Sequence, residues 1–330
     1  MSTRRFRAAA TLAIGFLTIA LFAVWIPGCN SREDVWPKDH AGPKVVVSFA
    51  PLYCFAVNVA GDDAVVRNMM TTSGPHHFNP TDKDARLLQR ADLFLINGIG
   101  LEGDKPATLA RSSGNTKLQI VDLGSLIPEE KLFEGSCHHD HGDGVKHDHG
   151  KDPHVWLSPD YAILQVQGIR EALKKADPDH AAGYDQRAAA YIKKLEQLKT
   201  DGVELLKGKS DRNIVTFHDS MTYFAKSFGI NIVGVVQKNP GTEPNSKNLA
   251  ELIGLCADEK HPVRVITVEP QYGTSSSANE VVKELRHRKV PDPTLVEFDP
   301  LETVTPGELT PEWYVTKMRA NIEALAKAMK

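Results

Sequence analysis

From Lys44 onward, short apolar runs alternate with segments of helical pattern, and this alternation restricts the possible folds more than any other feature. Short apolar runs bounded by polar residues are typical of strands buried on both faces of a sheet. Strands that alternate with helices predict parallel sheets covered on both sides. The predicted strands form two sets, Val45–Phe49, Val65–Met69, Leu93–Ile96 and Leu118–Val121 in the first, and Ile214–Phe217, Ile230–Val236, Val263–Val268 and Leu295–Phe298 in the second.

The predicted helices lie between these strands. Thr81 and Asp84 have the spacing of a capping box, which predicts a helix over Thr81–Ala91. A further helix is expected to start near Ser158-Pro159. The second set of strands is interleaved with helices expected at about 219–228, 246–259, 275–287 and 310–328.

The segment from Asp177 to Lys207 has the pattern of one long helix. Apolar or small residues recur mostly three or four positions apart from Ala181 to Leu205. A helix of roughly 30 residues spans about 45 Å, which is long enough to run along two lobes. We therefore predict an α/β protein of two βα lobes with parallel sheets, residues 44–176 and 209–330, joined by one long rigid helix over 177–208.

The N-terminus has the pattern of a targeting segment, in which three arginines precede the uncharged apolar stretch Ala8–Ile26. The stretch ends in Ile26-Pro27-Gly28-Cys29, which resembles the cleavage box of bacterial lipoproteins. We expect residues 1–28 to be a signal peptide, Cys29 to be lipidated, and residues 29–43 to form a tether. The alternative is an uncleaved membrane anchor, because the stretch approaches a spanning length. Both patterns place the remaining chain outside the cytoplasm.

Charge and cysteine content narrow the class of protein further. Without residues 1–28 the chain carries 36 basic and 42 acidic residues and has no basic stripe, so nucleic acid is not an expected partner. Once Cys29 is lipidated, three cysteines remain, and this odd number allows at most one disulfide. Cys54 and Cys256 lie in apolar helical contexts and are expected to be buried thiols, whereas Cys137 is a candidate soft metal ligand.

Six of the thirteen histidines fall between His138 and His154. This density indicates metal binding, because neutral imidazole is the commonest protein ligand for zinc and related metals. His154 lies in the stiffer segment Asp152–Leu157, where a defined position is expected. The other five lie among glycines and aspartates, in a loop over 134–151 that cannot hold a fixed geometry: His138, His139, His141, His147 and His149.

Two interpretations of this His-rich loop are open. In the first, the loop captures additional zinc weakly and supplies or senses a central site. In the second, it is a hydrophilic surface insertion whose histidines have no specific role.

Three histidines are expected to meet where ligands bind in open α/β sheets, beyond the carboxyl ends of the strands. His76 follows the second strand, His218 directly follows the fifth, and His154 precedes a helix. Glu269 and Asp299 follow later strands and reach the same edge. Three imidazoles and one carboxylate fill a tetrahedral zinc shell, which suits binding better than catalysis.

Six segments, in order along the chain, carry a family resemblance that runs from about Lys44 to the C-terminus. They are Pro75–Thr81, Asp152–Pro159, Thr216–Ser220 with Tyr223–Ala225, Thr242–Ser246, Glu269–Tyr272 and Asp299–Leu301. In these segments the chain resembles the ZnuA/TroA-like metal-binding lipoproteins, the solute-binding proteins of zinc and manganese ABC importers. The resemblance implies metal held in a cleft between the lobes by His76, His154 and His218, with Asp299 at the position that supplies a carboxylate in some members.

The remaining site residues follow from the same resemblance. Glu269 is expected to support the site or form the cleft wall, and His77 is expected to lie beside the site or at the surface. Asn79 replaces a glutamate that is common in the family motif, so this chain lacks any role of that carboxylate. Manganese sites in the family are more oxygen-rich, with glutamate at the place of His218, whereas nitrogen-rich ligation favours zinc.

The resemblance therefore implies a non-enzymatic carrier of Zn²⁺, a lipid-anchored monomer on the periplasmic or extracellular face of a membrane. It would deliver the ion to the membrane subunit of an ABC permease. The alternatives are a carrier of manganese or another divalent metal, an envelope adhesin or structural protein in which metal only stabilises the fold, and a zinc hydrolase with Glu269 as general base. No His-Glu-x-x-His motif supports the hydrolase.

Metal affinity is expected to depend on pH, because protons compete with metal for imidazole. An ordinary histidine pKa near 6.5 predicts a loss of affinity between about pH 7.5 and 5.5.

Overall fold

The computed structural model describes residues 36–72, 74–76, 78–135, 150–237, 246–258, 262–270, 276–305 and 307–330. The expected signal peptide, Cys29, His77, Cys137 and the five loop histidines lie outside these residues. Within them, no helix combines the length and apolar character needed to cross a membrane. Trp36, in the segment expected to be a tether, is buried, and its indole N–H donates to the carbonyl of Leu87 at 3.3 Å.

All eight predicted strands are present, and they form two parallel four-stranded sheets. In the first sheet the strand order is β2-β1-β3-β4, and the central strands are almost wholly apolar because both of their faces are buried. This lobe contains β1 (Lys44–Val47), α1 (Ala50–Ala60), β2 (Val65–Asn68), α2 (Asp82–Leu88), β3 (Leu93–Ile96), α3 (Lys105–Ser113) and β4 (Gln119–Asp122), followed by the short 3-10 turns η1 (Gly124–Leu126), η2 (Glu129–Lys131) and η3 (Val155–Leu157).

The predicted capping box is confirmed at the start of α2. The backbone N–H and the hydroxyl of Thr81 both donate to the carboxylate of Asp84, at 2.8 and 2.7 Å. The helix ends before Ala91, because the side-chain amide of Asn115 donates to the carbonyls of Leu88 and Ala91.

The second sheet repeats the first in its topology, with strand order β6-β5-β7-β8. The last helix begins three residues later than predicted, because the preceding turn is held against α1: Cys54 and Asn58 donate to the carbonyls of Thr310 and Pro311. This half contains β5 (Asn213–His218), α6 (Thr222–Phe228), β6 (Asn231–Gln237), α7 (Ser246–Cys256), β7 (Val265–Val268), α8 (Ser276–His287), β8 (Thr294–Glu297) and α9 (Trp313–Ala328).

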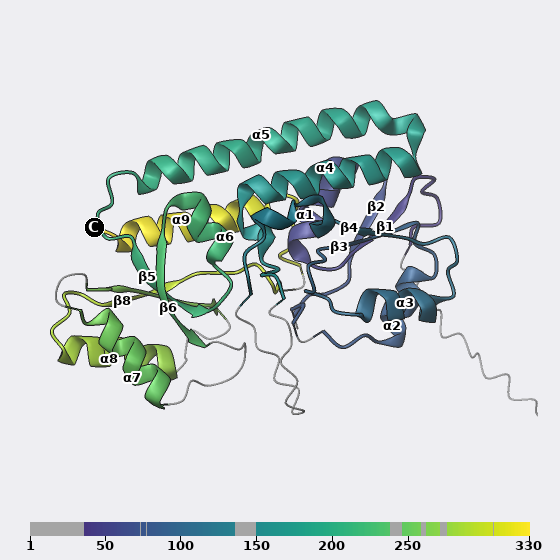
Figure 1. Cartoon of the computed structure of the whole chain (residues 1–330). Coiled ribbons are helices and arrows are strands. Elements are labelled where there is room, and N and C mark those ends of the chain that lie inside the picture. Colours follow the sequence, from purple (N-terminus) through teal and green to yellow (C-terminus); the bar gives the residue numbers. More distant parts are fainter. Residues whose placement is uncertain are drawn as a thin grey trace, which may run out of the picture. The chain divides into compact units, whose positions relative to one another are not determined.

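Two long helices connect the sheets: α4 (Pro159–Ala176) and α5 (Ala181–Leu206), which lie side by side (Figure 1). The 26 residues of α5 give a length of about 39 Å, and α5 continues past α4 to pack against α9. It starts at Ala181 because Asp177 ends α4 and accepts hydrogen bonds from His180 and Tyr184. The long linking helix is therefore confirmed, with a start four residues later than predicted.

At Gly202 the helix α5 lies very close to the side chains of two neighbouring helices. A Cβ atom at this position would lie 2.5 Å from Cε1 of Phe228 and 2.9 Å from Cδ1 of Ile322. Glycine therefore allows α5 to pack against α6 and α9 at this point, although glycine weakens a helix in general.

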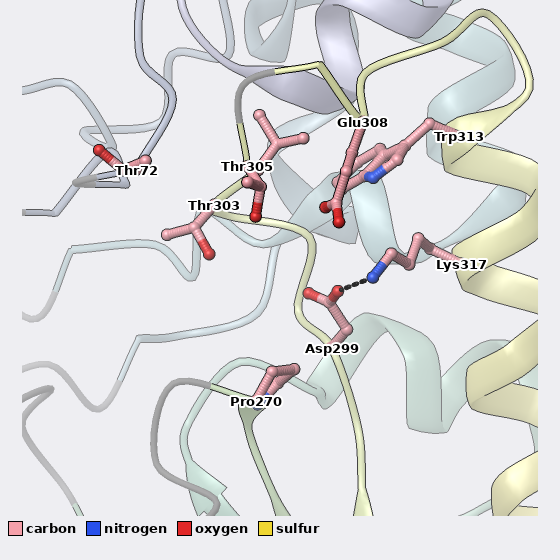
Figure 2. Close-up of a pocket in the computed structure, with 9 residues that line it drawn as sticks. Thr72, Pro270, Asp299, Thr303, Thr305, Glu308, Trp313 and Lys317 are labelled. Carbon is pink, nitrogen blue, oxygen red and sulfur yellow. Dashed lines mark ion pairs between the residues drawn. The ribbon is translucent and has the colours of Figure 1, made fainter.

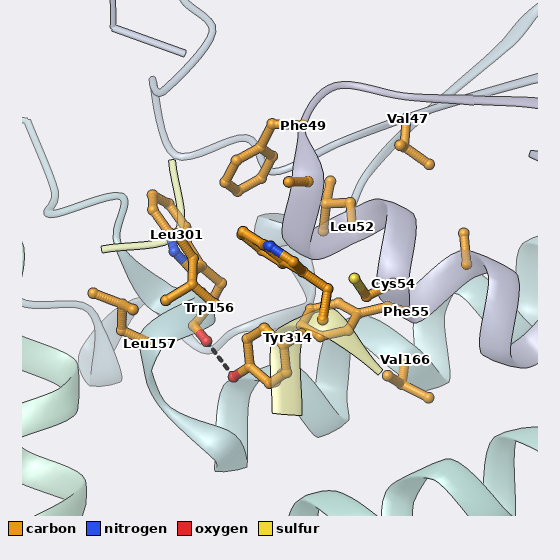
Figure 3. Packing of buried hydrophobic residues seen from close by; sticks show 14 of the residues in the cluster. Val47, Phe49, Leu52, Cys54, Phe55, Trp156, Leu157, Val166, Leu301 and Tyr314 are labelled. Carbon is orange, nitrogen blue, oxygen red and sulfur yellow. Dashed lines mark hydrogen bonds between the residues drawn. The ribbon is translucent and has the colours of Figure 1, made fainter. Parts of the chain in front are cut away.

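The core of the first lobe extends to the C-terminal part of the chain (Figure 3). The ring of Trp156 packs edge-on against Phe49 at 4.7 Å between centroids, and Tyr314 packs in the same way against Phe55. The Tyr314 hydroxyl donates to the carbonyl of Trp156 at 2.6 Å. These contacts join the segment around Trp156 to α9. Cys54 and Cys256 are free, buried thiols, as predicted.

Candidate metal centre

Four side chains from distant parts of the sequence meet at the carboxyl ends of the strands. His76 comes from the turn after β2, His154 from the residue before η3, and His218 from the end of β5. Glu302 comes from the turn that follows β8. Their ligand-capable atoms all lie within 4.8 Å of one another.

One carboxylate oxygen lies at the middle of this group. The Oε1 atom of Glu302 is 3.3 Å from Nε2 of His76, 3.2 Å from Nε2 of His154 and 3.6 Å from Nε2 of His218. His154, His218 and Glu302 are buried, and His76 is partly buried. Nε2 of His218 and Oε1 of Glu302 have no hydrogen-bond partner although they are buried. Buried polar atoms without partners are rare, and here they face a common point that suits a cation.

Two further carboxylates fix the orientation of the imidazoles. Oδ1 of Asp152 lies 2.7 Å from Nδ1 of His154 and also accepts the backbone N–H of His154 at 2.9 Å. Glu269 accepts a hydrogen bond from Nδ1 of His218. Because Nδ1 donates to a carboxylate in both rings, Nε2 faces the group and is the atom that can bind a metal once it has lost its proton.

Charges within the group shift its proton equilibria strongly. Burial by itself disfavours the imidazolium, but the carboxylates of Asp152 and Glu302 outweigh it and raise the pKa of His154 to about 10. At His218, burial lowers the pKa, but the carboxylate of Glu269 outweighs this effect, and the net result is a raised pKa. For Glu302, burial disfavours the charged form, but the surrounding imidazoles hold its pKa well below the usual range. A cation can replace the protons that this group holds.

Asp299 is not the carboxylate of this group, contrary to the expectation from sequence. Its Oδ2 atom is 3.1 Å from Nζ of Lys317, and it lines a separate cavity of about 250 Å³ (Figure 2). The physical reason is the turn that follows. Leu301 adopts a left-handed backbone conformation with φ of 63°, and this reversal brings Glu302 to the histidines.

The other candidate residues have distinct locations. Glu269 supports His218, in keeping with the expected auxiliary position. Asn79 is exposed and lies outside the four-residue group. Sequence reasoning missed Glu302 and Asp152. The only sequence signals were an acid three residues after Asp299 and another two residues before His154.

The base of the His-rich loop is described although residues 136–149 are not. Glu134 and Lys151 pair as an antiparallel bridge, and the N–H of Gly135 donates to Gly150 at 2.7 Å. Tyr223 of α6 holds this stem: its hydroxyl donates to the carbonyl of Asp152 and accepts the N–H of Phe133. Tyr223 thus binds both the segment that precedes the loop and the segment that follows it.

Two parallel-sheet lobes joined by a long helix, with histidines converging from both, define the class of two-lobed α/β solute-binding proteins. Residues 45–328 match the family model ZnuA, described as the periplasmic component A of the zinc-uptake complex. This chain belongs to that family.

Curated relatives support the same assignment. The chain is 31% identical over 294 residues to the zinc-binding protein AdcA of Streptococcus pyogenes serotype M3, covering 86% of this chain and 55% of that protein. It is also 31% identical over 278 residues to the high-affinity zinc uptake system protein ZnuA of Bacillus subtilis, covering 82% and 85%. The chain thus spans about half the length of the AdcA relatives it matches.

Solved structures show the same fold. A mutant of the laminin-binding adhesin Lmb from Streptococcus agalactiae has a TM-score of 0.72 at 26% identity, covering 88% of this chain and 100% of that one. Zn(II)-bound AdcA from Streptococcus pneumoniae has a TM-score of 0.68 at 29% identity, covering 87% of this chain and 57% of that one.

Proposed function

We propose that this chain is an extracytoplasmic carrier that binds Zn²⁺ through His76, His154, His218 and Glu302. The observation that carries the proposal is the convergence of three Nε2 atoms on one buried carboxylate oxygen. Three imidazole nitrogens and one carboxylate oxygen form a complete tetrahedral shell for zinc. The names of the AdcA and ZnuA relatives, which describe zinc binding and zinc uptake, support the same cargo.

Zinc is favoured over manganese by the donor atoms. Manganese prefers carboxylate, carbonyl and water oxygens, whereas imidazole suits zinc, copper and nickel. Three nitrogens in four donors therefore favour Zn²⁺ over Mn²⁺ at this centre.

A carrier is favoured over a zinc hydrolase by the position of Glu269. A hydrolase needs an open coordination position and a base beside the metal-bound water. Here the carboxylate of Glu269 is engaged by Nδ1 of His218, on the far side of the ring from Nε2. Glu302 occupies the fourth position.

Zinc binding can be tested by competition titration with a chromogenic chelator. The mature chain without residues 137–150 should bind one Zn²⁺ tightly. His154→Ala removes a ligand, so it should weaken zinc binding by more than the roughly 10–100-fold that is typical of losing an outer partner. His287→Ala is the matched control, because His287 is exposed on α8 and outside the group. Equal affinities of the His154 and His287 variants would overturn the proposal.

We further propose that the carrier is a monomer attached to the membrane by lipid on Cys29 and that it supplies an ABC permease. The family description as an uptake-complex component and the lipoprotein box at Cys29 support this. Cys29→Ala should abolish incorporation of labelled fatty acid and release the protein from the membrane fraction. Uptake of radioactive zinc at scarce zinc should require the chain, and uptake that is unchanged in its absence would contradict delivery.

A further inference from the structure

The turn that carries Glu302 is held from two sides. On one side, Asn321 of α9 binds both backbone groups of Asp299: its Oδ1 accepts the N–H at 2.9 Å, and its Nδ2 donates to the carbonyl at 2.7 Å. On the other side, the indole N–H of Trp156 donates to the carbonyl of Pro300 at 2.8 Å. Asn321 and Trp156 are both buried, so water does not compete for these bonds.

The side chain of Asp299 completes the turn. Its Oδ1 atom accepts the N–H of Leu301 at 2.9 Å, across the residue whose φ is 63°. A leucine in the left-handed region is unfavourable and persists only where its surroundings determine it. After Glu302, the N–H of Val304 donates to the carbonyl of Thr71 at 3.1 Å, which fixes the chain beyond the carboxylate.

We infer that Asn321 and Asp299 are positioning residues that set the zinc affinity of this protein by holding Glu302 at the three histidines. Neither residue belongs to the four-residue group. The inference rests on the proposed function, because it concerns how Glu302 reaches the metal. The ion pair between Asp299 and Lys317 is not part of this turn, because it uses the other carboxylate oxygen, Oδ2.

The test is a double-mutant cycle on zinc affinity, measured by chelator competition on the mature chain. Asn321→Leu keeps the size of the side chain and removes both hydrogen bonds. It should weaken zinc binding by about tenfold or more, as loss of an outer partner does. In the Glu302→Ala background the same change should cost less than about twofold, because there is no carboxylate left to position. Additive losses, or no loss in the wild-type background, would overturn the inference.

Variants of Asp299 keep the test decisive if Asn321→Leu does not fold. Asp299→Asn retains an oxygen that can accept the Leu301 N–H, so its zinc affinity should stay close to that of the wild type. Asp299→Ala should lower zinc affinity by about tenfold. Lys317→Met, which breaks only the ion pair, is the control and should bind as the wild type does. Equal affinity of the Asp299→Ala and Asp299→Asn variants would contradict the inference.

A spectroscopic readout separates positioning from general damage to the fold. With Co²⁺ as the probe, the visible spectra of Asn321→Leu and Asp299→Ala should resemble that of Glu302→Ala and differ from the wild type. Wild-type spectra in both variants would overturn the inference. If the wild-type protein fails to bind zinc tightly, the proposed function fails; if only Glu302→Ala weakens binding, the positioning inference alone fails.

Discussion

Oδ1 of Asp152 lies 2.7 Å from Nδ1 of His154, and both side chains are almost fully buried. Asp152 thereby fixes which nitrogen of the ring keeps its hydrogen when a metal binds and which nitrogen faces the candidate metal centre. The same carboxylate oxygen binds the backbone N–H of His154, so the ring and its main chain are held together. This pair links the end of the His-rich loop to the proposed zinc site.

Removing the Asp152 carboxylate should therefore weaken zinc binding without removing a ligand. We expect Asp152→Ala to lower zinc affinity by about 10–100-fold, the usual effect of losing an outer partner of a metal-binding histidine. Asp152→Asn keeps an acceptor oxygen but loses the charge, so its loss should be smaller. Titration of the two variants side by side checks this, and a larger loss for the asparagine variant would contradict it.

Zinc binding should release protons at neutral pH. The raised pKa of His154, about 10 against an ordinary 6.5, means that the metal-free folded protein holds this proton at pH 7.5. Zinc must displace this proton, so zinc affinity should keep rising above pH 7.5. With an ordinary histidine pKa near 6.5, the affinity would level off there. Calorimetric titration in two buffers of different ionisation enthalpy measures the protons released. A value of zero at pH 7.5 would contradict the raised pKa.

The same shift predicts how the stability of the metal-free protein depends on pH. A folded pKa above the unfolded one means that the protonated His154 stabilises the fold. This contribution is fully present below about pH 6.5 and is lost as the pH rises toward 10. The free energy of unfolding, measured with urea on the metal-free protein, should fall over this range more in the wild type than in His154→Gln.

Gly202 should tolerate no side chain. Gly202→Ala gains about 1 kcal/mol of helix propensity but forces a methyl group against the ring of Phe228, which is buried. Overpacking typically costs about 1–3 kcal/mol, so we expect a net loss of stability. Gly254→Ala in α7 is the matched control, because nothing lies within 4 Å of its Cβ position. It should stabilise the protein slightly, and equal midpoints of urea unfolding for the two variants would contradict the packing argument.

Deletion of residues 137–150 should leave the central site intact. The deletion removes the stem bond from Gly135 to Gly150, but Glu134 still pairs with Lys151 and the N–H of Asp152 still donates to the carbonyl of Phe133 at 2.9 Å, so the stem should stay closed. Tight binding of one zinc should persist, while weaker zinc binding should disappear if the loop captures metal. Calorimetric titration measures the number of zinc ions bound at the tight and at the weak sites. Unchanged total stoichiometry together with unchanged uptake at scarce zinc would show that the loop has no such role.

The sequence predicted the strands well because their apolar runs are continuous and their ends are polar. It also brought His76, His154 and His218 to one edge, since parallel strands end on the same side. It expected Asp299 beside these histidines, whereas the structure places Glu302 there. The choice between Asp299 and Glu302 depends on the left-handed conformation of Leu301, which is held by Asn321 and Trp156 from elsewhere in the chain. The bond from the N–H of Leu301 to Asp299 is local, but the contacts from Asn321 and Trp156 come from 22 and 144 residues away, and no local pattern reports them.

Helix starts were shifted for a related reason. The periodicity of α9 extends toward Thr310, but Cys54 and Asn58 of α1 hold residues 310 and 311 outside the helix. These contacts join positions more than 250 residues apart, as the separations of 256 and 253 show. Sequence periodicity reports only neighbours within a turn or two.

The central claim is that His76, His154, His218 and Glu302 together hold one zinc ion. Anomalous scattering at the zinc edge from crystals of the zinc-loaded protein tests it most directly. We predict one strong peak at about 2.0–2.2 Å from Nε2 of each histidine and from a carboxylate oxygen of Glu302. A peak bound by Asp299 in place of Glu302, or no peak among the three histidines, would contradict it.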